Sequence, residues 1–532
     1  MRRGTLAAYW VTSFLAGSAL LTVEMTATRA LAPFFGQAQF VWANVIGLML
    51  AGLALGNMVG GRLADRRGGA GVLGVFLLFA AALVVFAAFS PPIVARWILP
   101  PELSLEVAYP FLLKGSFLTT AACFVPPVVA LGAITPLTVR CASDTIETVG
   151  TRTGSICAAG TIGSIAATFL TTHVLVPTFG TRGTLLLAAG TLAVAAAIPL
   201  SLRGRKGAAG LVLAIGCAAG IGATAPSIRA ATPGAAFGDL IAARESRYQH
   251  LEIRERRDLP KAARVLAIDE GHDSVQSVTP HEGVLTGGLY YDYLNLLALD
   301  ASRSGALSIA ILGFGGGTHA RQLLEIVGPK CRLTITGVEL DAEAVAMGRD
   351  HLGLRDDPRL SVLTDLDART FVDHGDRLFD LIYVDCYERQ SFIPTHVASI
   401  EFFRAALRRL EPDGVLALNL FGYGARDPVV VRVCTTLARA ADRRVALMPL
   451  PQTANLLAWT GGRATRLPTR WDASGWSAEC AALAEDLRSR PGQFFWVDDP
   501  KGVATTDDDG SFDALQYERL AAHSERLLSN AR

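Results

Sequence analysis

The chain has 532 residues, of which 51% are hydrophobic and only 18% are charged, whereas soluble proteins are roughly 25% charged. Its formal net charge of +1 gives no sign of a nucleic-acid partner, which would require a strongly basic surface. The eight cysteines are scattered and form no C-x-x-C pair, so we expect neither a disulfide framework nor a metal site.

The hydrophobic residues are concentrated in residues 1–230, which we assign to a helical transmembrane domain. Apolar stretches of about 20 residues are long enough to cross a bilayer. We expect about seven such spans, near residues 7–31, 41–61, 71–91, 110–134, 153–175, 183–202 and 207–225. Arginine and lysine mark the cytoplasmic side of a membrane protein, and their distribution between the spans predicts a cytoplasmic amino terminus.

Residues 237–300 are interpreted as a small antiparallel β domain. Polar and apolar residues alternate within residues 247–255, 263–269 and 274–278. This alternation is typical of strands with one face in the core and one in water. Residues 289–297 then predict a helix that leads into the next domain.

Residues 301–465 predict a doubly wound α/β domain. Short apolar runs that end at glycine or an acid predict buried parallel strands in the segments IAILGFGGGTHAR (309–321), ITGVELD (335–341) and FDLIYVDCYE (379–388). Helical segments lie between them, and this alternation of strand and helix is typical of such sheets. Residues 466–532 are a C-terminal extension, and their pattern indicates no role.

Ligands bind to doubly wound sheets at the carboxyl ends of the strands. The glycine-rich turn at residues 313–317 allows a ligand to approach the backbone, and Glu339 ends the next strand just over twenty residues later. A carboxylate at that position can bind both hydroxyls of a ribose. Together with Asp367 and Ala368 farther along the chain, the pattern favours nucleoside binding over a turn that only packs a helix on a strand.

The side of the membrane on which this domain lies depends on the number of spans. Seven spans that begin inside would leave the domain outside the cell, although a nucleoside-type substrate is normally cytoplasmic. Residues 207–225 are rich in alanine and glycine and are the weakest of the predicted spans. We therefore expect a multi-pass protein of the inner cell membrane with its second half in the cytoplasm.

The order and spacing of these motifs resemble those of spermidine synthases, the polyamine aminopropyltransferases. Tyr-Gln in the β domain, Tyr-Tyr-Asp, the glycine turn, V-E-L-D, D-A-R and V-D-x-x-E follow one another over about residues 240–425. The chain is thus similar to a membrane-fused member of that family, whose α/β domain has the fold of S-adenosylmethionine methyltransferases. The resemblance implies decarboxylated S-adenosylmethionine, or S-adenosylmethionine itself, as co-substrate and no permanently bound cofactor.

The resemblance also implies a role for individual residues. Asp385 matches the catalytic aspartate, and Tyr290 matches a tyrosine near the reacting amine. The nucleoside donor would be contacted by Gln249, Gly313, Gly315, Gly316, Glu339, Asp367, Ala368 and Pro394. The amine would be bound by Glu388, Tyr291 and Asp292.

Several positions depart from the family pattern. Gly316 stands where the family has an aspartate that holds the substrate amine, and Tyr291 replaces a substrate-binding histidine. The later P-T-Y-P-S-G stretch has no counterpart. The resemblance therefore supports nucleoside binding more strongly than putrescine as the acceptor. Two alternatives stay open: an S-adenosylmethionine-dependent methyltransferase, and a transporter of polyamines or amino acids whose α/β domain senses a nucleoside.

The chemistry of the remaining side chains is consistent with amine transfer. A carboxylate at the end of a strand can orient an ammonium group and accept its proton, and Asp385 lies in such a position, with Glu388 three residues later to hold the amine. His319 follows the glycine turn, where its ring faces either the ligand or the helix surface. We expect amine and nucleoside substrates and the lipid bilayer as partners, with a homodimer as a candidate assembly.

Overall fold

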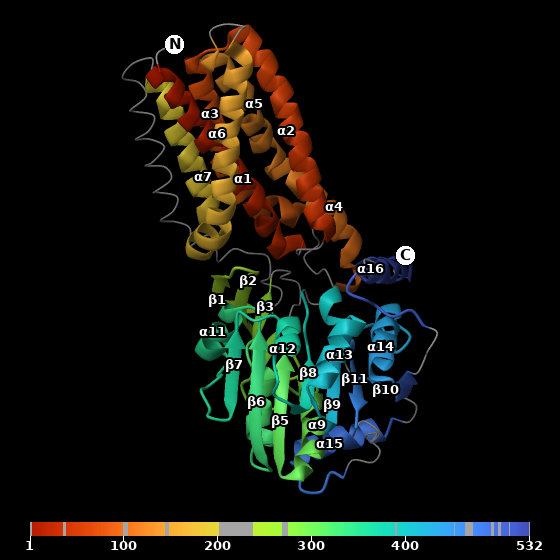
Figure 1. Cartoon of the computed structure of the whole chain (residues 1–532). Coiled ribbons are helices and arrows are strands. Elements are labelled where there is room, and N and C mark those ends of the chain that lie inside the picture. The colour runs from red at the N-terminus through yellow and green to blue at the C-terminus, as the bar shows by residue number, and fades with distance from the viewer. Residues whose placement is uncertain are drawn as a thin grey trace. The chain divides into compact units, whose positions relative to one another are not determined.

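The computed structural model describes residues 3–35, 39–98, 105–143, 148–201, 238–268, 275–388, 391–451, 453–462, 472–490, 494–497, 502–509 and 511–530. The chain divides into two compact units, both drawn in Figure 1. The first consists of Met1–Ala236 with two short later segments, Glu245–His250 and Asp269–His272. The second contains the other residues from Phe237 to Arg532.

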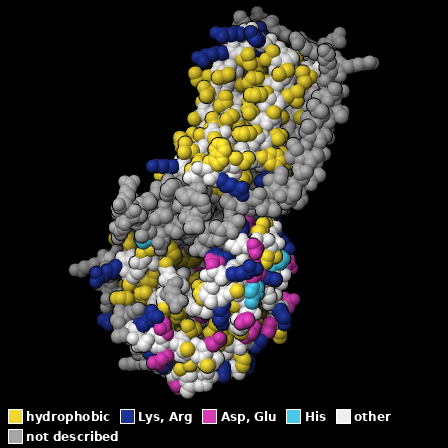
Figure 2. All heavy atoms as spheres, turned by 180° about the vertical axis from the view of Figure 1, so that it is seen from behind, with side chains coloured by type: hydrophobic (Ala, Val, Ile, Leu, Met, Phe, Trp, Pro, Cys, Tyr) yellow, Lys and Arg dark blue, Asp and Glu magenta, His cyan; other side chains and the backbone are white. Residues whose placement is uncertain are grey.

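The first unit is built of long helices. They are α1 (Arg3–Phe35), α2 (Gln39–Arg67), α3 (Ala70–Ile98), α4 (Leu105–Cys123), α5 (Val125–Ala142), α6 (Val149–Leu170) and α7 (Val176–Ser201). Within the described residues, six segments are long and apolar enough to cross a membrane. Figure 2 shows hydrophobic side chains over most of the visible face of this unit, with lysine and arginine near its ends. These features fit a membrane-associated unit.

Two of the predicted membrane spans do not correspond to single helices among the described residues. The predicted span at residues 110–134 is divided in the structure, because α4 ends at Cys123 and α5 begins at Val125. Pro126 and Pro127 follow directly in the first turn of α5, where proline is tolerated because its missing N–H has no partner within the helix. The candidate membrane span in this region begins with α5 at Val125 and ends at Ala142. The predicted span at residues 207–225 lies outside the described residues.

The small β domain is confirmed as a four-stranded sheet in the order β1-β2-β3-β4. Its strands are β1 (Asp239–Glu245), β2 (His250–Arg256), β3 (Ala263–Ile268) and β4 (Ser277–Pro280). The β2–β3 and β3–β4 pairs are antiparallel, as predicted. The sequence reasoning missed β1. Helix α11 (Ala342–His351) covers one face of the sheet, and its Met347 packs against Leu251 and Ile253 of β2.

The large sheet has eight strands in the order β12-β10-β11-β9-β8-β5-β6-β7. They are β5 (Ala306–Leu312), β6 (Arg332–Glu339), β7 (Leu360–Thr364), β8 (Phe379–Val384), β9 (Leu410–Phe421), β10 (Val445–Pro449), β11 (Asn455–Gly461) and β12 (Phe495–Val497). The strands from β7 to β9 are parallel, and β11, β10 and β12 add antiparallel pairs. The sheet thus extends into residues 466–532, which the sequence reasoning had treated as a separate extension.

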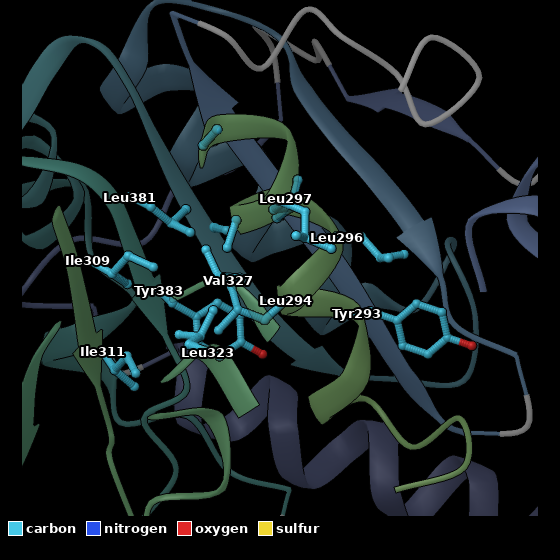
Figure 3. Close-up of a cluster of buried hydrophobic side chains, with 14 of the residues drawn as sticks. Tyr293, Leu294, Leu296, Leu297, Ile309, Ile311, Leu323, Val327, Leu381 and Tyr383 are labelled. Carbon is cyan, nitrogen blue, oxygen red and sulfur yellow. The ribbon is translucent and has the colours of Figure 1, made fainter. Parts of the chain in front are cut away.

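Helices cover both faces of this sheet. One core contains residues of α9 (Tyr291–Ala301), α10 (Thr318–Ile326) and α15 (Ala478–Arg488). Figure 3 shows part of it, with Leu294 and Leu323 near Ile309 and Tyr383 of the sheet. The opposite core contains residues of α12 (Ala368–His374), α13 (Ile400–Arg408), α14 (Pro428–Ala441) and α16 (Ser511–Asn530). A predominantly parallel sheet buried on both faces is the predicted Rossmann-like architecture.

The strand order creates a switch point between β5 and β8. From β5 the chain proceeds through β6 to β7 on one side, and it then returns to β8 on the other side of β5. Crevices at such points are the usual ligand sites of open α/β sheets. The residues after Leu312 and Val384, at the carboxyl ends of these two strands, therefore define the candidate site.

Candidate functional site

The glycine turn between β5 and α10 lies directly against the end of β8. Gly313 has a φ of +84°, and a Cβ at this position would lie 2.2 Å from the backbone oxygen of Asp385. Both facts require glycine, because other residues rarely adopt this conformation and have no room here. The turn ends at Gly317, which caps α10 with a φ of +90°. The predicted glycine turn thus brings the ends of β5 and β8 together.

Glu339 at the end of β6 is joined to this turn. Its Oε2 accepts a hydrogen bond of 2.6 Å from the N–H of Gly315, and its Oε1 accepts one of 2.9 Å from the N–H of Asp341. Burial raises the pKa of the Glu339 carboxyl, while the two N–H donors oppose that shift. The carboxylate therefore has a fixed orientation beside the glycine turn, as a ribose-binding acid requires.

Asp367 and Ala368 begin α12 after the end of β7. The Asp367 carboxylate accepts hydrogen bonds from the N–H groups of Arg369 and Thr370 and so caps the helix. Its other oxygen lies 3.1 Å from Nε2 of His396. This hydrogen bond lowers the pKa of Asp367 and raises that of His396. Ala368 is buried in the core beneath.

Asp385 is the central carboxylate at the switch point. Its Oδ1 accepts a hydrogen bond of 2.8 Å from Nδ2 of Asn419, near the end of β9. Its Oδ2 lies 3.3 Å from Nε2 of His319 on α10. The Asp385 side chain is only 9% exposed. Residues from three elements thus meet at this carboxylate.

Tyrosine rings form one wall beside Asp385. The rings of Tyr290 and Tyr291 lie 3.9 Å apart, and the ring of Tyr383 lies 4.8 Å from that of His319. Burial and, to a smaller extent, the charge of Asp385 raise the pKa of Tyr290 well above its usual value. Its hydroxyl is therefore neutral and can donate a hydrogen bond but cannot act as a base. The Cys386 thiol also has a pKa well above its usual value, chiefly through burial, and is no thiolate nucleophile.

Two of the predicted amine-binding residues have hydrogen-bonding partners within the fold. Asp292 is fully buried and accepts hydrogen bonds from the N–H groups of Thr286, Gly287 and Gly288 and from Nε2 of Gln322. The hydrogen bonds from Thr286, Gly287 and Gly288 fix the loop before α9 to the Asp292 carboxylate. The hydroxyl of Tyr291 donates to the carbonyl oxygen of Val275 at 3.1 Å, so it too has a structural partner.

Gly316 is enclosed by neighbouring side chains. Its N–H donates to Oγ of Ser277 at 2.8 Å, and a Cβ here would lie 2.7 Å from Cδ1 of Leu352. The aspartate that the resemblance implies at this position would therefore not fit without displacing Leu352. Gly316 can contribute backbone to a ligand site but leaves no space for a second carboxylate.

Three other predicted residues lie in loops. Gln249 is in the turn between β1 and β2, where its N–H donates to Oγ of Ser246. Glu388 is exposed after β8, and its N–H donates to the carbonyl oxygen of Phe392. Pro394 precedes the short 3-10 helix η5 (Thr395–Val397).

The loop after β8 is held by the last helix. Gln516 of α16 accepts a hydrogen bond from the N–H of Ile393 and donates one to its carbonyl oxygen, at 2.9 Å and 3.0 Å. Arg519 donates to the carbonyl oxygens of Ser391 and Phe421. The C-terminal segment, for which the sequence indicated no role, therefore orders the loop that carries Pro394.

Two residues of the site were not among those predicted to bind or react. His319 is only 4% exposed and contacts Asp385, so a position on the helix surface is wrong for it. Its place directly after the glycine turn was the available signal. Asn419 was missed entirely, although a polar residue near the end of an otherwise apolar strand could have indicated a function.

Several known proteins are similar to the second half of this chain. Residues 301–456 match the family model of the spermine/spermidine synthase domain. A probable polyamine aminopropyl transferase of Bifidobacterium longum is 35% identical over 176 residues, which are 33% of this chain and 36% of that protein. A polyamine aminopropyltransferase of Corynebacterium efficiens is 32% identical over 171 residues, which are 29% of this chain and 32% of that protein. The chain thus spans about a third of the length of these curated relatives.

A solved structure, a probable spermidine synthase from Corynebacterium glutamicum, is also similar. It is 18% identical, with a TM-score of 0.40, and the match covers 51% of this chain and 97% of that chain. The family match confirms the resemblance read from the motifs: the chain carries a spermine/spermidine synthase domain after its apolar helices.

Proposed function

We propose that this protein is a membrane-associated aminopropyltransferase, which transfers an aminopropyl group from decarboxylated S-adenosylmethionine to an amine. The observation that supports this most directly is the carboxylate of Asp385, which is held between Asn419 and His319 beside the glycine turn. The match of residues 301–456 to the spermine/spermidine synthase domain gives independent support.

In the proposed reaction, Asp385 prepares the acceptor amine. Such an amine has a free pKa near that of lysine, about 10.4, and is protonated at neutral pH. Asp385 orients the ammonium and accepts its proton. The free amine attacks the methylene next to the sulfonium, a C–N bond forms, and the C–S bond breaks. The electron pair of the broken C–S bond stays on the sulfur and neutralises its positive charge, and methylthioadenosine leaves. No covalent enzyme intermediate forms.

Other residues in this proposal bind the substrates. Glu339 binds the ribose, Asp367 and Ala368 lie beside the adenine, and Glu388 holds the far end of the amine. Most of the rate enhancement would come from orientation and electrostatic stabilisation. We further propose that this domain is cytoplasmic, that the helical unit lies in the inner cell membrane, and that a homodimer is a candidate assembly.

A second candidate is a methyltransferase that uses S-adenosylmethionine itself. It is favoured by Gly316 and Tyr291, which replace the two residues that the resemblance implies at the substrate amine. The enclosed surroundings of Gly316 and the hydrogen bond from Tyr291 to Val275 leave neither position with a free charged group. The two activities differ in the donor they consume and in the group they transfer.

The test measures products by mass spectrometry, using the full-length protein in detergent with either donor and a panel of amines. We expect methylthioadenosine and an aminopropylated amine only with the decarboxylated donor. Asp385→Asn should lower turnover roughly 10²–10⁴-fold, the usual range for loss of a general base. Asp376→Asn, an exposed residue before β8, is the matched control and should leave turnover unchanged.

Other outcomes would contradict the proposal. Methylated products with S-adenosylmethionine would assign the chain to the methyltransferases. Binding of methylthioadenosine without turnover of any amine would instead favour the hypothesis of a transporter or sensor. An Asp385→Asn variant with wild-type turnover would mean that the base is another residue.

A further inference from the structure

Among the residues that the structure describes, the buried His319 has one hydrogen-bonding partner. Its side chain is 4% exposed, and its ring is surrounded by those of Tyr383, Tyr291 and Tyr290 at 4.8, 5.2 and 6.0 Å. Its Nδ1 has no hydrogen-bond partner among the described residues. An unpaired polar atom in a core is costly, so an apolar side chain would pack here at lower cost. The contact between Nε2 and Asp385 offers a reason why this position holds a histidine and not an apolar residue.

That contact determines which ring nitrogen carries the proton. Nε2 lies 3.3 Å from Oδ2 of Asp385, and an ionised carboxylate only accepts hydrogen bonds. Nε2 must therefore carry a proton in order to donate to this oxygen. The distance is at the long end for a hydrogen bond, which is common in catalytic sites that contain no ligand.

The opposite oxygen of Asp385 is held from the other side. Nδ2 of Asn419 donates to Oδ1 of Asp385 at 2.8 Å, and Oδ1 of Asn419 accepts from Nδ2 of Asn455 at 3.0 Å. The second bond fixes which end of the Asn419 amide faces the carboxylate. His319 on α10 and Asn419 on β9 therefore each engage one oxygen, and the carboxylate cannot turn without breaking one of these bonds.

We propose that His319 is a positioning residue that holds the Asp385 carboxylate in the orientation needed to receive the amine. Two lone-pair sites of the carboxylate are used by His319 and Asn419, and the others stay free for the ammonium. Without His319, one bond would hold the group and it could rotate about its last side-chain torsion. This inference rests on the proposed transferase function and adds a residue to it.

The experiment compares His319→Leu with His319→Gln in the full-length protein. Leucine is similar in size to histidine but has no hydrogen-bond donor. The amide of glutamine, in contrast, can donate a hydrogen bond from about the position of Nε2. We expect His319→Leu to lower kcat roughly 10–100-fold, because small misplacements of catalytic groups have effects of this size. The Kd for methylthioadenosine should stay within about twofold, and His319→Gln should recover most of the lost kcat.

A double variant separates positioning from a purely structural role. If His319 acts through Asp385, His319→Leu should cause no further loss of turnover in the Asp385→Asn background. A full additional loss would overturn the inference, as would an unchanged kcat for His319→Leu or a glutamine variant no better than leucine.

A spectroscopic measurement keeps the inference testable if no amine is turned over and the proposed function fails. In ¹⁵N spectra of the histidine-labelled full-length protein, the signal lost in His319→Gln should report a protonated Nε2. Asp385→Asn should shift that signal. An Nε2 without a proton, or a signal insensitive to Asp385→Asn, would overturn the positioning role.

Discussion

The acidic residues in and near the site differ in how many hydrogen bonds their carboxylates already accept from the protein. Glu339 ends β6 and Asp385 directly follows β8, and both carboxylates lie beside the glycine turn. Asp292 is also an acid next to this region, yet the loop before α9 occupies its carboxylate. We therefore propose binding roles for the first two carboxylates and a structural role for the third, because different donors surround them.

We expect Glu339→Ala to weaken the binding of methylthioadenosine by about 1.5–3 kcal/mol, the usual contribution of a hydrogen bond to a charged group. The affinity should thus fall roughly 10–150-fold. Calorimetry on the full-length protein measures this change. Glu325→Ala, which removes an exposed acid of α10, is the control and should bind normally. Equal affinities of Glu339→Ala and wild type would refute the role of Glu339 in ribose binding.

Among the elements, the short helix η5 is attached to helices α12 and α16 by polar contacts. Nε2 of His396, within η5, lies 3.1 Å from Oδ2 of Asp367, the residue that caps α12. On the other side, Oγ1 of Thr395 donates to the Asp513 carboxylate of α16 at 2.9 Å. The segment that follows Pro394 is therefore held between α12 and α16, next to the predicted adenine position.

This attachment should depend on pH. Because the hydrogen bond raises the pKa of His396 above 6.5, its stabilisation is fully present below pH 6.5 and disappears as the pH rises through the raised value. Because the same bond lowers the pKa of Asp367 below 3.8, its stabilisation is present above pH 3.8 and disappears as the pH falls through the lowered value. The attachment should be strongest between these two limits. Both side chains are partly exposed, so the effect should be small.

Hydrogen exchange measures the effect on residues 391–399. After correction for the intrinsic exchange rate, protection of this segment should be greater at pH 6 than at pH 9. His396→Gln should abolish the difference, whereas His374→Gln, at the end of α12, should preserve it. A difference that persists in His396→Gln would assign the pH dependence to another group.

At the scale of the whole molecule, the number of spans determines where the second unit lies. An even number of crossings returns the chain to the side on which it began. The described residues contain six candidate spans, which supports a cytoplasmic second unit if the amino terminus is cytoplasmic, as the arginine distribution predicts. We therefore predict a cytoplasmic amino terminus and a cytoplasmic second unit.

Cysteine labelling of intact cells tests this topology. In a background without reactive native cysteines, Gln37→Cys should react with an impermeant maleimide from outside. Gly69→Cys, between α2 and α3 where a side chain has space, should react only after the membrane is opened. Glu325→Cys in the second unit should behave like Gly69→Cys. Labelling of Glu325→Cys in intact cells would place the second unit outside.

The amino-acid pattern by itself determined most of the apolar helices, three of the four strands of the small sheet and the parallel core of the large one. These features depend on local hydrophobic periodicity, which a single segment carries within itself. The glycine turn, Glu339 and Asp385 were predictable for the same reason, because each directly follows an apolar strand and the carboxyl ends of parallel strands share one edge.

The tertiary structure alone decided which polar groups meet there. Asn419 and His319 come from separate elements and converge on Asp385 only once β9 and α10 pack beside β8. Asp292 resembles a ligand residue in the sequence, but folding surrounds it with donors from its own loop and from Gln322. Likewise, β12 and α16 carry no motif, and their roles follow from long-range pairing with β10 and with Ile393. Such contacts join residues far apart in the chain, and no local pattern encodes them.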